Sequence, residues 1–280
     1  EGTMRKKLVG LVACAATLAL SVALLAGCAG SGSNDKAADN NAASTDKTTL
    51  TVGFDQSYPP YGFVGDDGKY TGFDLDLAQA VCDKNGWSFE ATPIDWDAKD
   101  ALLSQGNINC IWNGFTMEGR EDGYTFSDPY MLNEQVVVVK AGSDISDFAG
   151  LSGKTVMTQV DSAALDVLEG DQAEVAATFK GGAAKIISDY NNAFMQLDSG
   201  MTDAVACDLS IAQYQIAANP DKYVQLSTPL STEHYAVGFK KGDTELAQKV
   251  TETLKQLDAD GTVKQLCEKY ASYGISYDNW

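Results

Sequence analysis

The run EQVVVVK, residues 134–140, separates two stretches of sequence that each alternate strand and helix signals. It is apolar and long enough to pass from one lobe of a protein to another. A similar run, HYAVGFKKGD (234–243), follows the second stretch. Two α/β units joined by two extended crossings predict a two-lobed fold. Small ligands bind in the cleft that such units leave between them.

The first unit begins with the β-branched run TLTVGF (49–54) and continues with helix and strand signals in turn. Gly86 and Gly106 follow the two helical patterns at the position of a C-cap residue. Strands that alternate with helices through short connections indicate a parallel sheet. The later segments of this unit are DLDLAQAVCDKNG, WSFEATPI, AKDALLSQG and INCIW.

The second unit repeats the alternation, and a long amphipathic helical stretch (244–271) follows the second crossing. We therefore expect an α/β fold with two parallel-core sheets flanked by helices and two hinge crossings. The first lobe is expected at 48–137, the second lobe at 138–231, and a return to the first lobe at 232–280. The segments of the second unit are GKTVMTQ, SAALDVLE, KIISDY, NNAFMQLDSG, DAVACD and IAQYQIAANP.

Length and charge limit the classes of function. The chain has 280 residues, enough to bury a substantial core in two modest lobes. Twenty Lys and Arg residues against 39 Asp and Glu residues give a formal net charge of −19. Such a surface repels phosphates, so we do not expect a nucleic-acid partner.

The first residues have the pattern of an export signal. Three basic residues (5–7) precede an unbroken apolar and small-residue run from Leu8 to Gly27. A polar tract then follows, which favours a signal peptide at 1–27 over an uncleaved anchor, and a flexible tether at 28–47. Without residues 1–27 the charge is 17 minus 38, or −21. The role of residues 1–3, before Met4, stays open.

Four of the six cysteines fall within the expected lobes, and no C-x-x-C spacing occurs among them. The pattern does not support a zinc site, and we expect neither a metal nor a cofactor. A disulfide is permitted outside the cytoplasm, but spacing does not give its partners. Small buried thiols are at least as consistent with the pattern. The four residues are Cys82, Cys110, Cys207 and Cys267.

Over residues 48–280 the chain resembles the bacterial solute-binding proteins of polar amino-acid ABC importers. The resemblance is carried by LTVGFD, YPPYGF, GKYTGFDLDLAQAV, IDWD, ALLSQG, TFSDPY, DSAA, TDAVACD and AVGFKKGD, in this order. It implies a periplasmic-binding-protein-like (Venus flytrap) fold that closes around one free amino acid and then docks on a membrane permease. The protein is expected to be a monomer.

The tetrad LAGC (25–28) resembles the signal of bacterial lipoproteins. That resemblance implies that Cys28 is lipidated and becomes the mature N-terminus. The expected location is extracytoplasmic, anchored to the cell membrane through the lipid. Whether the host has an outer membrane stays open.

The stretch WNGFTMEGRED (112–122) suggests how a ligand carboxylate is held. Arg120 is the candidate, because a guanidinium makes two parallel charge-assisted hydrogen bonds to a carboxylate. Asn113, Gly114 and Thr116 follow a strand end and could add backbone and hydroxyl donors. The alternative is a surface arginine paired with a neighbouring acid, Glu121 or Asp122.

An amino acid also carries an ammonium group, which needs a carboxylate from the other lobe. The resemblance places Asp208, at the end of DAVACD, in that role, whereas its alternative role is N-cap of the helix near Ser210. The resemblance also implies that Ser162 and Ala163, in DSAA, offer a hydroxyl and backbone donors to the ligand carboxylate.

The ligand side chain is expected to meet aromatic residues. Tyr58 and Trp96 match wall positions of the family, whereas Tyr61 could instead pack beneath its loop. Asp55 could hold a cationic or amide group at the far end of the ligand. No second Arg or Lys stands in the motif loops, which disfavours a dicarboxylate such as glutamate. Polar, basic, aromatic and sulfur-containing amino acids, cystine included, all remain open.

Two other functions are compatible with this scaffold. A dehydratase acting on cyclohexadienyl acids could share the scaffold, but it would need a general acid, for which only Asp55 and Glu118 offer themselves. A receptor sensor domain would need a signalling segment. His234, the only histidine, lies at the second crossing without a partner nucleophile or metal-ligand cluster. We therefore expect a hinge or surface role for it and no catalytic residues.

Overall fold

The structure is a computed structural model, and it describes residues 48–280. The expected signal peptide, tether and lipidation site at Cys28 lie outside the described residues. Among the helices that the structure describes, none is both long and apolar enough to cross a membrane.

The first lobe is built on a five-stranded sheet. Strand β1 runs parallel to both of its neighbours, β5 and β6, whereas β14 is antiparallel to β6 and β7. In order across the sheet the strands are β5 (Ser88–Pro93), β1 (Thr49–Phe54), β6 (Cys110–Ile111), β14 (Gly238–Lys240) and β7 (Tyr124–Phe126). The helices of this lobe are α1 (Phe73–Asn85), α2 (Lys99–Gln105), α7 (Thr244–Ala259) and α8 (Thr262–Lys269).

The second lobe has a six-stranded sheet in which β9 runs parallel to β10 and β11, and β8 runs antiparallel to β11, β12 and β13. Its path is β10 (Lys185–Ile187), β9 (Val156–Gln159), β11 (Ala204–Asp208), β8 (Met131–Lys140) and β12 (Tyr223–Gln225), with β13 (Ser231–Tyr235) also on β8. The helices are α3 (Ala163–Glu169), α4 (Ala173–Ala176), α5 (Tyr190–Ser199) and α6 (Leu209–Ala218).

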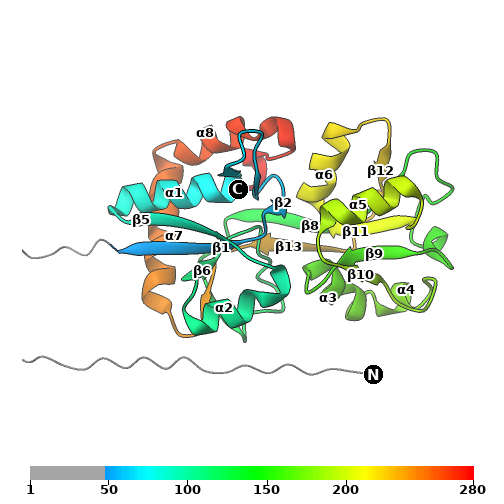
Figure 1. The fold of residues 1–280 in the computed structure, drawn as a ribbon, viewed down its shortest axis with the longest axis horizontal. Helices are drawn as coiled ribbons and strands as arrows, with labels where there is room; N and C mark the ends of the chain where they lie inside the picture. Colours follow the sequence, from blue (N-terminus) through cyan, green and yellow to red (C-terminus); the bar gives the residue numbers. More distant parts are fainter. Residues whose placement is uncertain (1–47) are drawn as a thin grey trace, which may run out of the picture. The chain divides into compact units, whose positions relative to one another are not determined.

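The two crossings form one antiparallel strand pair. Met131–Gln135 of β8 pair with Ser231–Tyr235 of β13, and the remainder of β8 continues into the second sheet beside β11 and β12. Figure 1 shows β8 and β13 side by side between the two lobes. The predicted two-lobed α/β fold is confirmed, although each sheet also contains antiparallel strands.

The second half of the sequence departs from prediction in two places. The run 234–243 is two strands, because the chain leaves β8 after Tyr235 and joins β6 and β7 of the other sheet at Gly238. The helical stretch 244–271 is broken at Gly261, whose φ of 86° ends the helical path between α7 and α8.

The first half of the sequence also contains a small sheet that was not predicted. Its strands are β2 (Ser57–Tyr58), β3 (Gly62–Val64) and β4 (Tyr70–Thr71). They are too short to show the alternation of apolar and polar residues that marks a strand.

The unbroken valine run of β8 is explained by cover on both faces. Val136 and Val138 belong to the large core cluster, whereas Val137 and Val139 face the separate core of the second lobe. Successive side chains of a strand point to opposite faces, so a strand packed on both sides is apolar at every position.

All four cysteines of the described residues are buried in the large core cluster. Cys110, Cys207 and Cys267 are free thiols. For these three residues the structure therefore agrees with the buried-thiol alternative rather than with a disulfide.

Gly72 fixes the loop that carries Tyr58 and Tyr61 against helix α1. Its φ of 143° lies in a region reserved for glycine, and a Cβ there would sit 2.1 Å from the Tyr61 carbonyl oxygen. Next to it, the Phe73 N–H donates to the Pro60 carbonyl at 2.8 Å. Only glycine permits this close approach of the two backbone segments.

A comparison of two glycine substitutions tests this constraint. We expect Gly72→Ala to lower the free energy of unfolding by about 3 kcal/mol or more, because backbone strain and steric overlap act together. Gly68→Ala is the matched control, since Gly68 also has a positive φ (76°) but nothing lies within 4 Å of an added Cβ. There we expect a loss of about 1 to 2 kcal/mol. Urea unfolding followed by tryptophan fluorescence measures both, and equal losses would contradict the account.

Candidate functional site

A narrow cavity lies between the two lobes. Its volume of about 10 Å³ leaves room for the centre of one water molecule. Eight of the ten predicted ligand-binding residues line it, joined by Gln159, which was not predicted. The first lobe contributes Tyr58, Trp96, Gly114, Thr116 and Arg120, and the second contributes Gln159, Ser162, Ala163 and Asp208.

Most of these residues stand at or just after the ends of strands. Trp96 follows β5, and Gly114 follows β6. Gln159 and Asp208 are the last residues of β9 and β11. The carboxyl ends of parallel strands meet at one edge of a sheet, and the two sheets turn these edges toward the same cavity.

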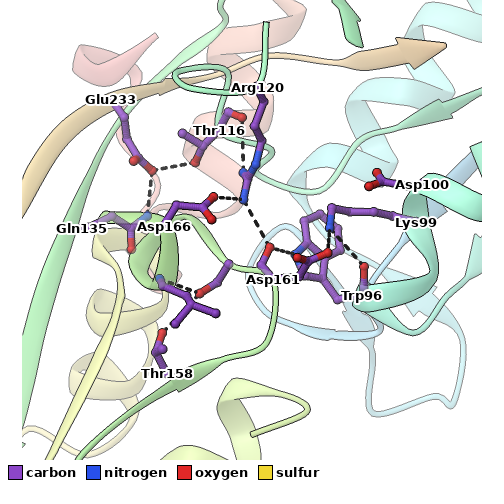
Figure 2. Close-up of polar contacts among 12 residues, drawn as sticks. Trp96, Lys99, Asp100, Thr116, Arg120, Gln135, Thr158, Asp161, Asp166 and Glu233 are labelled. Atoms are coloured by element: carbon purple, nitrogen blue, oxygen red, sulfur yellow. Dashed lines mark hydrogen bonds and ion pairs between the residues drawn. The ribbon is translucent and has the colours of Figure 1, made fainter. Parts of the chain in front are cut away.

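The Arg120 guanidinium spans from the first lobe to the second. Its Nη2 donates to Asp166 Oδ2 at 2.9 Å and to the Asp161 carbonyl oxygen at 3.2 Å (Figure 2). Its side chain is 12% exposed and lies over the Phe115 ring, 5.0 Å from the centroid. The ion pair with Asp166 replaces the pairing with a neighbouring acid that the sequence left as an alternative.

Asp161 receives donors from three residues of the first lobe. Its carbonyl oxygen accepts from Trp96 Nε1 at 3.1 Å as well as from Arg120, and its carboxylate accepts from Lys99 Nζ at 2.5 Å. Lys99 is only 3% exposed, although it is a lysine. Asp161 has a φ of 59°, a left-handed conformation that few residues other than glycine adopt. These contacts hold the lobes together beside the cavity (Figure 2).

Asp208 is buried at the end of β11, where it lines the cavity from the second lobe. Its Oδ1 accepts from Gln135 Nε2 at 2.7 Å, Asn133 Nδ2 at 2.9 Å and the Tyr235 hydroxyl at 2.9 Å. Burial raises the pKa of this carboxyl above its usual value, against hydrogen bonds that lower it. Asp208 occupies the N-cap position of α6, but its side chain makes no capping hydrogen bond. The capping alternative for its side chain is therefore wrong.

The donors predicted beside Arg120, from Gly114 and Thr116, form hydrogen bonds with buried acids. The Gly114 N–H donates to Asp74 Oδ2 at 2.6 Å, and the Thr116 hydroxyl donates to Glu233 Oε1 at 2.6 Å. Asp74 is fully buried, and burial raises its pKa to about 7. Buried carboxylates need hydrogen-bond donors, which explains where these two donors point. Both residues line the cavity, while these two donors are engaged by the buried acids.

Ser162 caps helix α3 in addition to lining the cavity. Its Oγ accepts from the Leu165 N–H at 3.2 Å and lies 3.2 Å from the Thr158 hydroxyl. This is the usual role of a serine at an N-cap. Ala163, the first residue of α3, offers its backbone beside it.

Asp55 and Asn113 do not line the cavity. Asp55 accepts from the Ser57 N–H and from Gln159 Nε2, both at 2.7 Å. Burial raises the pKa of its carboxyl, and the residue lines a second cavity of about 440 Å³ that Trp96 also lines. Asn113 is 1% exposed and packs against the backbone of Gly62. Asp55 thus contacts the cavity residue Gln159, and Asn113 directly precedes the cavity residue Gly114.

Two further expectations concern residues outside the cavity. Tyr61 is buried and packs edge-on against Phe73 and Tyr235, with ring centroids 6.0 and 5.2 Å away. This agrees with the packing role that the sequence left open. His234 lies on the crossing strand β13, where its backbone N–H and ring Nδ1 contact the Glu118 carboxylate at 2.9 and 2.7 Å.

Sequence reasoning missed several residues that shape the site. Gln159 had a usable signal, because it ends a strand whose neighbours in the sheet are parallel. The others depend on which strands pair and how the lobes meet, which no local pattern reveals. They are Lys99, Asn133, Gln135, Asp161, Asp166 and Glu233.

A guanidinium and a buried carboxylate that has no cationic partner thus face one cavity from different lobes. Among the residues that the structure describes, no lysine, arginine or histidine forms an ion pair with Asp208. This arrangement is complementary to a small molecule that carries both a carboxylate and an ammonium group.

Comparison with known proteins identifies the family of this chain. The sequence profile of bacterial extracellular solute-binding proteins, family 3, matches residues 50–273. The L-cystine-binding protein TcyJ of Escherichia coli (strain K12) is 28% identical over 254 residues, which cover 90% of this chain and 92% of TcyJ. The L-cystine-binding protein TcyA of Bacillus subtilis (strain 168) is 27% identical over 283 residues, covering 98% and 100%.

A solved structure gives the same result for the fold. The substrate-binding protein of an ABC uptake transporter from Streptococcus pneumoniae, crystallised with bound histidine, is 34% identical. It superimposes with a TM-score of 0.78 and covers 82% of this chain and 94% of its own. The family predicted from the sequence motifs is confirmed, and this chain belongs to the bacterial extracellular solute-binding proteins, family 3.

Proposed function

We propose that this protein captures a free α-amino acid in the cavity between its lobes and delivers it to the permease of an ABC importer. The observation that carries the proposal is the placement of Arg120 and Asp208 on the same cavity from opposite lobes. A zwitterion bound between them would join the lobes through both of its charged groups. The chemistry of the site thus agrees with the amino-acid-binding relatives.

The ligand carboxylate is proposed to bind Arg120. In the structure, Asp166 already places one carboxylate oxygen on this guanidinium, 2.9 Å from Nη2. A ligand carboxylate would take that position and could use both arms of the fork. Ser162 and Ala163 lie on the same cavity and would add a hydroxyl and a backbone N–H.

The ligand ammonium is proposed to bind Asp208, whose carboxylate has only neutral hydrogen-bond partners in the part of the chain that the structure describes. Tyr58 and Trp96 would form the walls around the ligand side chain. Asp55, reached through Gln159, would lie beyond its far end. Gly114 and Thr116 would line the site beside Arg120, and Asn113 would lie next to Gly114 outside the cavity. Polar, basic, aromatic and sulfur-containing amino acids all remain candidates for the ligand.

Capture requires the lobes to move apart, because the cavity admits only about one water molecule. β8 and β13 are the two chain connections between the lobes, so they are the natural hinge. The ligand would favour the closed state by touching both lobes, and the closed, loaded form would engage the permease. A lipid on Cys28 would keep the protein at the outer side of the cell membrane.

The enzyme alternative gains no support from the two acids that the sequence offered. Asp55 does not line the cavity, and Glu118 contacts His234 instead. A general acid must come within hydrogen-bond reach of the reacting group. The binding role therefore explains the placed residues better than catalysis does.

A thermal-shift panel tests the proposed function. The folded part, residues 48–280, is purified, unfolded and refolded to remove carried ligand, and then heated with each common amino acid and with L-cystine. A ligand at about a hundred times its Kd should add about 2.7 kcal/mol to the free energy of unfolding. We expect a clear rise in Tm for one amino acid or a chemically related few. A panel without any shift would contradict the proposal.

Replacement of Arg120 tests the carboxylate contact. We expect Arg120→Ala to weaken binding of the amino acid found in the panel by about 100-fold, because a charge-assisted hydrogen-bond pair is lost. Lys180→Ala is the matched control, since Lys180 is exposed on the second lobe and outside the cavity. Calorimetric titration measures both variants. If Arg120→Ala bound as tightly as the control, Arg120 would not hold the carboxylate.

A further inference from the structure

Three adjacent strands bring two acids and two amides onto one face of the sheet. Asp208 of β11 is paired with Gln135 of β8, and Asn133 of β8 is paired with Glu233 of β13. Asn133 and Gln135 are two residues apart, so their side chains point to the same face. The register of the crossing strands therefore places a carboxylate on each side of the two amides.

The two amides bridge the two carboxylates. Gln135 Nε2 lies 2.7 Å from both Asp208 Oδ1 and Glu233 Oε1, and Asn133 Nδ2 lies 2.9 and 2.8 Å from the same oxygens. Thr116 adds its hydroxyl to Glu233, as Figure 2 shows together with Gln135. The Gln135 Oε1 atom has no hydrogen-bond partner among residues 48–280. The amide thus turns its donor side to the acids and leaves its acceptor unpaired.

No cation balances this pair within the described residues. Asp208 and Glu233 are 4% and 3% exposed, and neither forms an ion pair with a lysine, arginine or histidine. The ionisable groups around Asp208 are Cys207, Tyr58, Tyr61, Tyr190 and Tyr235, and Tyr235 also faces Glu233. Burial raises the pKa of each of these thiol and phenol groups, so they stay neutral near pH 7.

The charged side chains near Asp208 and Glu233 do not neutralise this pair. Arg120 lines the same cavity as Asp208 but is engaged with Asp166, and His234 next to Glu233 contacts Glu118. Burial raises the pKa of Glu233, and the charge of Asp208 raises it further. Two buried carboxylates that share donors do not both ionise readily, and their protons leave in two coupled steps.

We propose that Asp208 and Glu233 form one acidic centre that holds a proton until a ligand ammonium group arrives, and that amino-acid capture releases this proton to the solvent. The inference rests on the proposed function, because it needs an ammonium beside Asp208. The ammonium keeps its own protons, one carboxyl O–H bond breaks, and the proton passes to water. Glu233 does not line the cavity, so it is a positioning residue that acts through Asp208.

The sign of the pH dependence follows from this coupling. Below the pKa of the pair the centre is protonated and the ammonium must displace a proton. Affinity should therefore fall by up to about tenfold for each pH unit of acidification within that range. Without Glu233 the repulsion on Asp208 is lost. The same fall in affinity should then begin at lower pH.

Calorimetry in paired buffers tests the inference. L-arginine, L-glutamine, L-histidine and L-cystine are titrated in turn into the wild-type protein, in two buffers of different ionisation heat, between about pH 5 and pH 8. The difference in heat counts the protons released per ligand. We expect up to about one proton from the wild type in the pH range where the centre is protonated, and fewer from Glu233→Gln, which keeps the size and an acceptor oxygen. The comparison between variants cancels any proton that the ligand itself loses.

Glu134→Gln is the matched control. Glu134 lies on β8 between Asn133 and Gln135, and its side chain therefore points to the opposite face. It should release as many protons as the wild type. If the wild type binds but releases none, or if Glu233→Gln releases as many as Glu134→Gln, the inference fails and the proposed function stands. If no amino acid of the full panel binds, both fail.

A measurement without ligand guards against a folding defect. A proton held in the folded state but not in the unfolded state makes wild-type stability fall as pH rises through the raised pKa. Glu233→Gln should fold and show a smaller fall than the wild type over about pH 5 to 8. Equal falls in both proteins would overturn the shared proton.

Discussion

The antiparallel pairing of β8 with β13 is the constraint on which the candidate site depends. Both chain connections between the lobes run through it, and its register sets Asn133 beside Glu233. The same strand β8 continues beside β11, which sets Gln135 beside Asp208. Since the pair is also the natural hinge, the acidic side of the site is built into the element about which the lobes would move.

The cations and the buried acids around the cavity have different kinds of partners. The cations, Arg120 and Lys99, reach across to acids of the second lobe, Asp166 and Asp161. Within residues 48–280, the buried acids Asp208 and Glu233 receive only neutral donors. Burying a carboxylate without a cation is unfavourable, and such sites concentrate where a ligand supplies the missing charge. An amino acid would do so at Asp208 while its carboxylate displaced that of Asp166.

The sequence predicts features that depend on local motifs, and it does not predict features that depend on contacts between distant segments. Tyr58, Trp96, Arg120 and Asp208 were predicted as site residues, and all four line the cavity. They could be identified because the strand ends and the order of the motifs are recognisable in the sequence. The direction of the Gly114 and Thr116 donors was not predicted, since it is set by Asp74 and Glu233 from distant segments. The bridging amides were missed for the same reason, because their role exists only in the register of β8 with its neighbours.

The most direct test of the central claim is a crystal structure of the folded part with the amino acid that stabilises it most. We expect a ligand carboxylate on the Arg120 guanidinium, with Asp166 displaced, and a ligand ammonium within hydrogen-bond distance of the Asp208 carboxylate. A ligand seated elsewhere, such as in the 440 Å³ cavity lined by Asp55 and Trp96, with Arg120 still paired to Asp166, would contradict this binding mode.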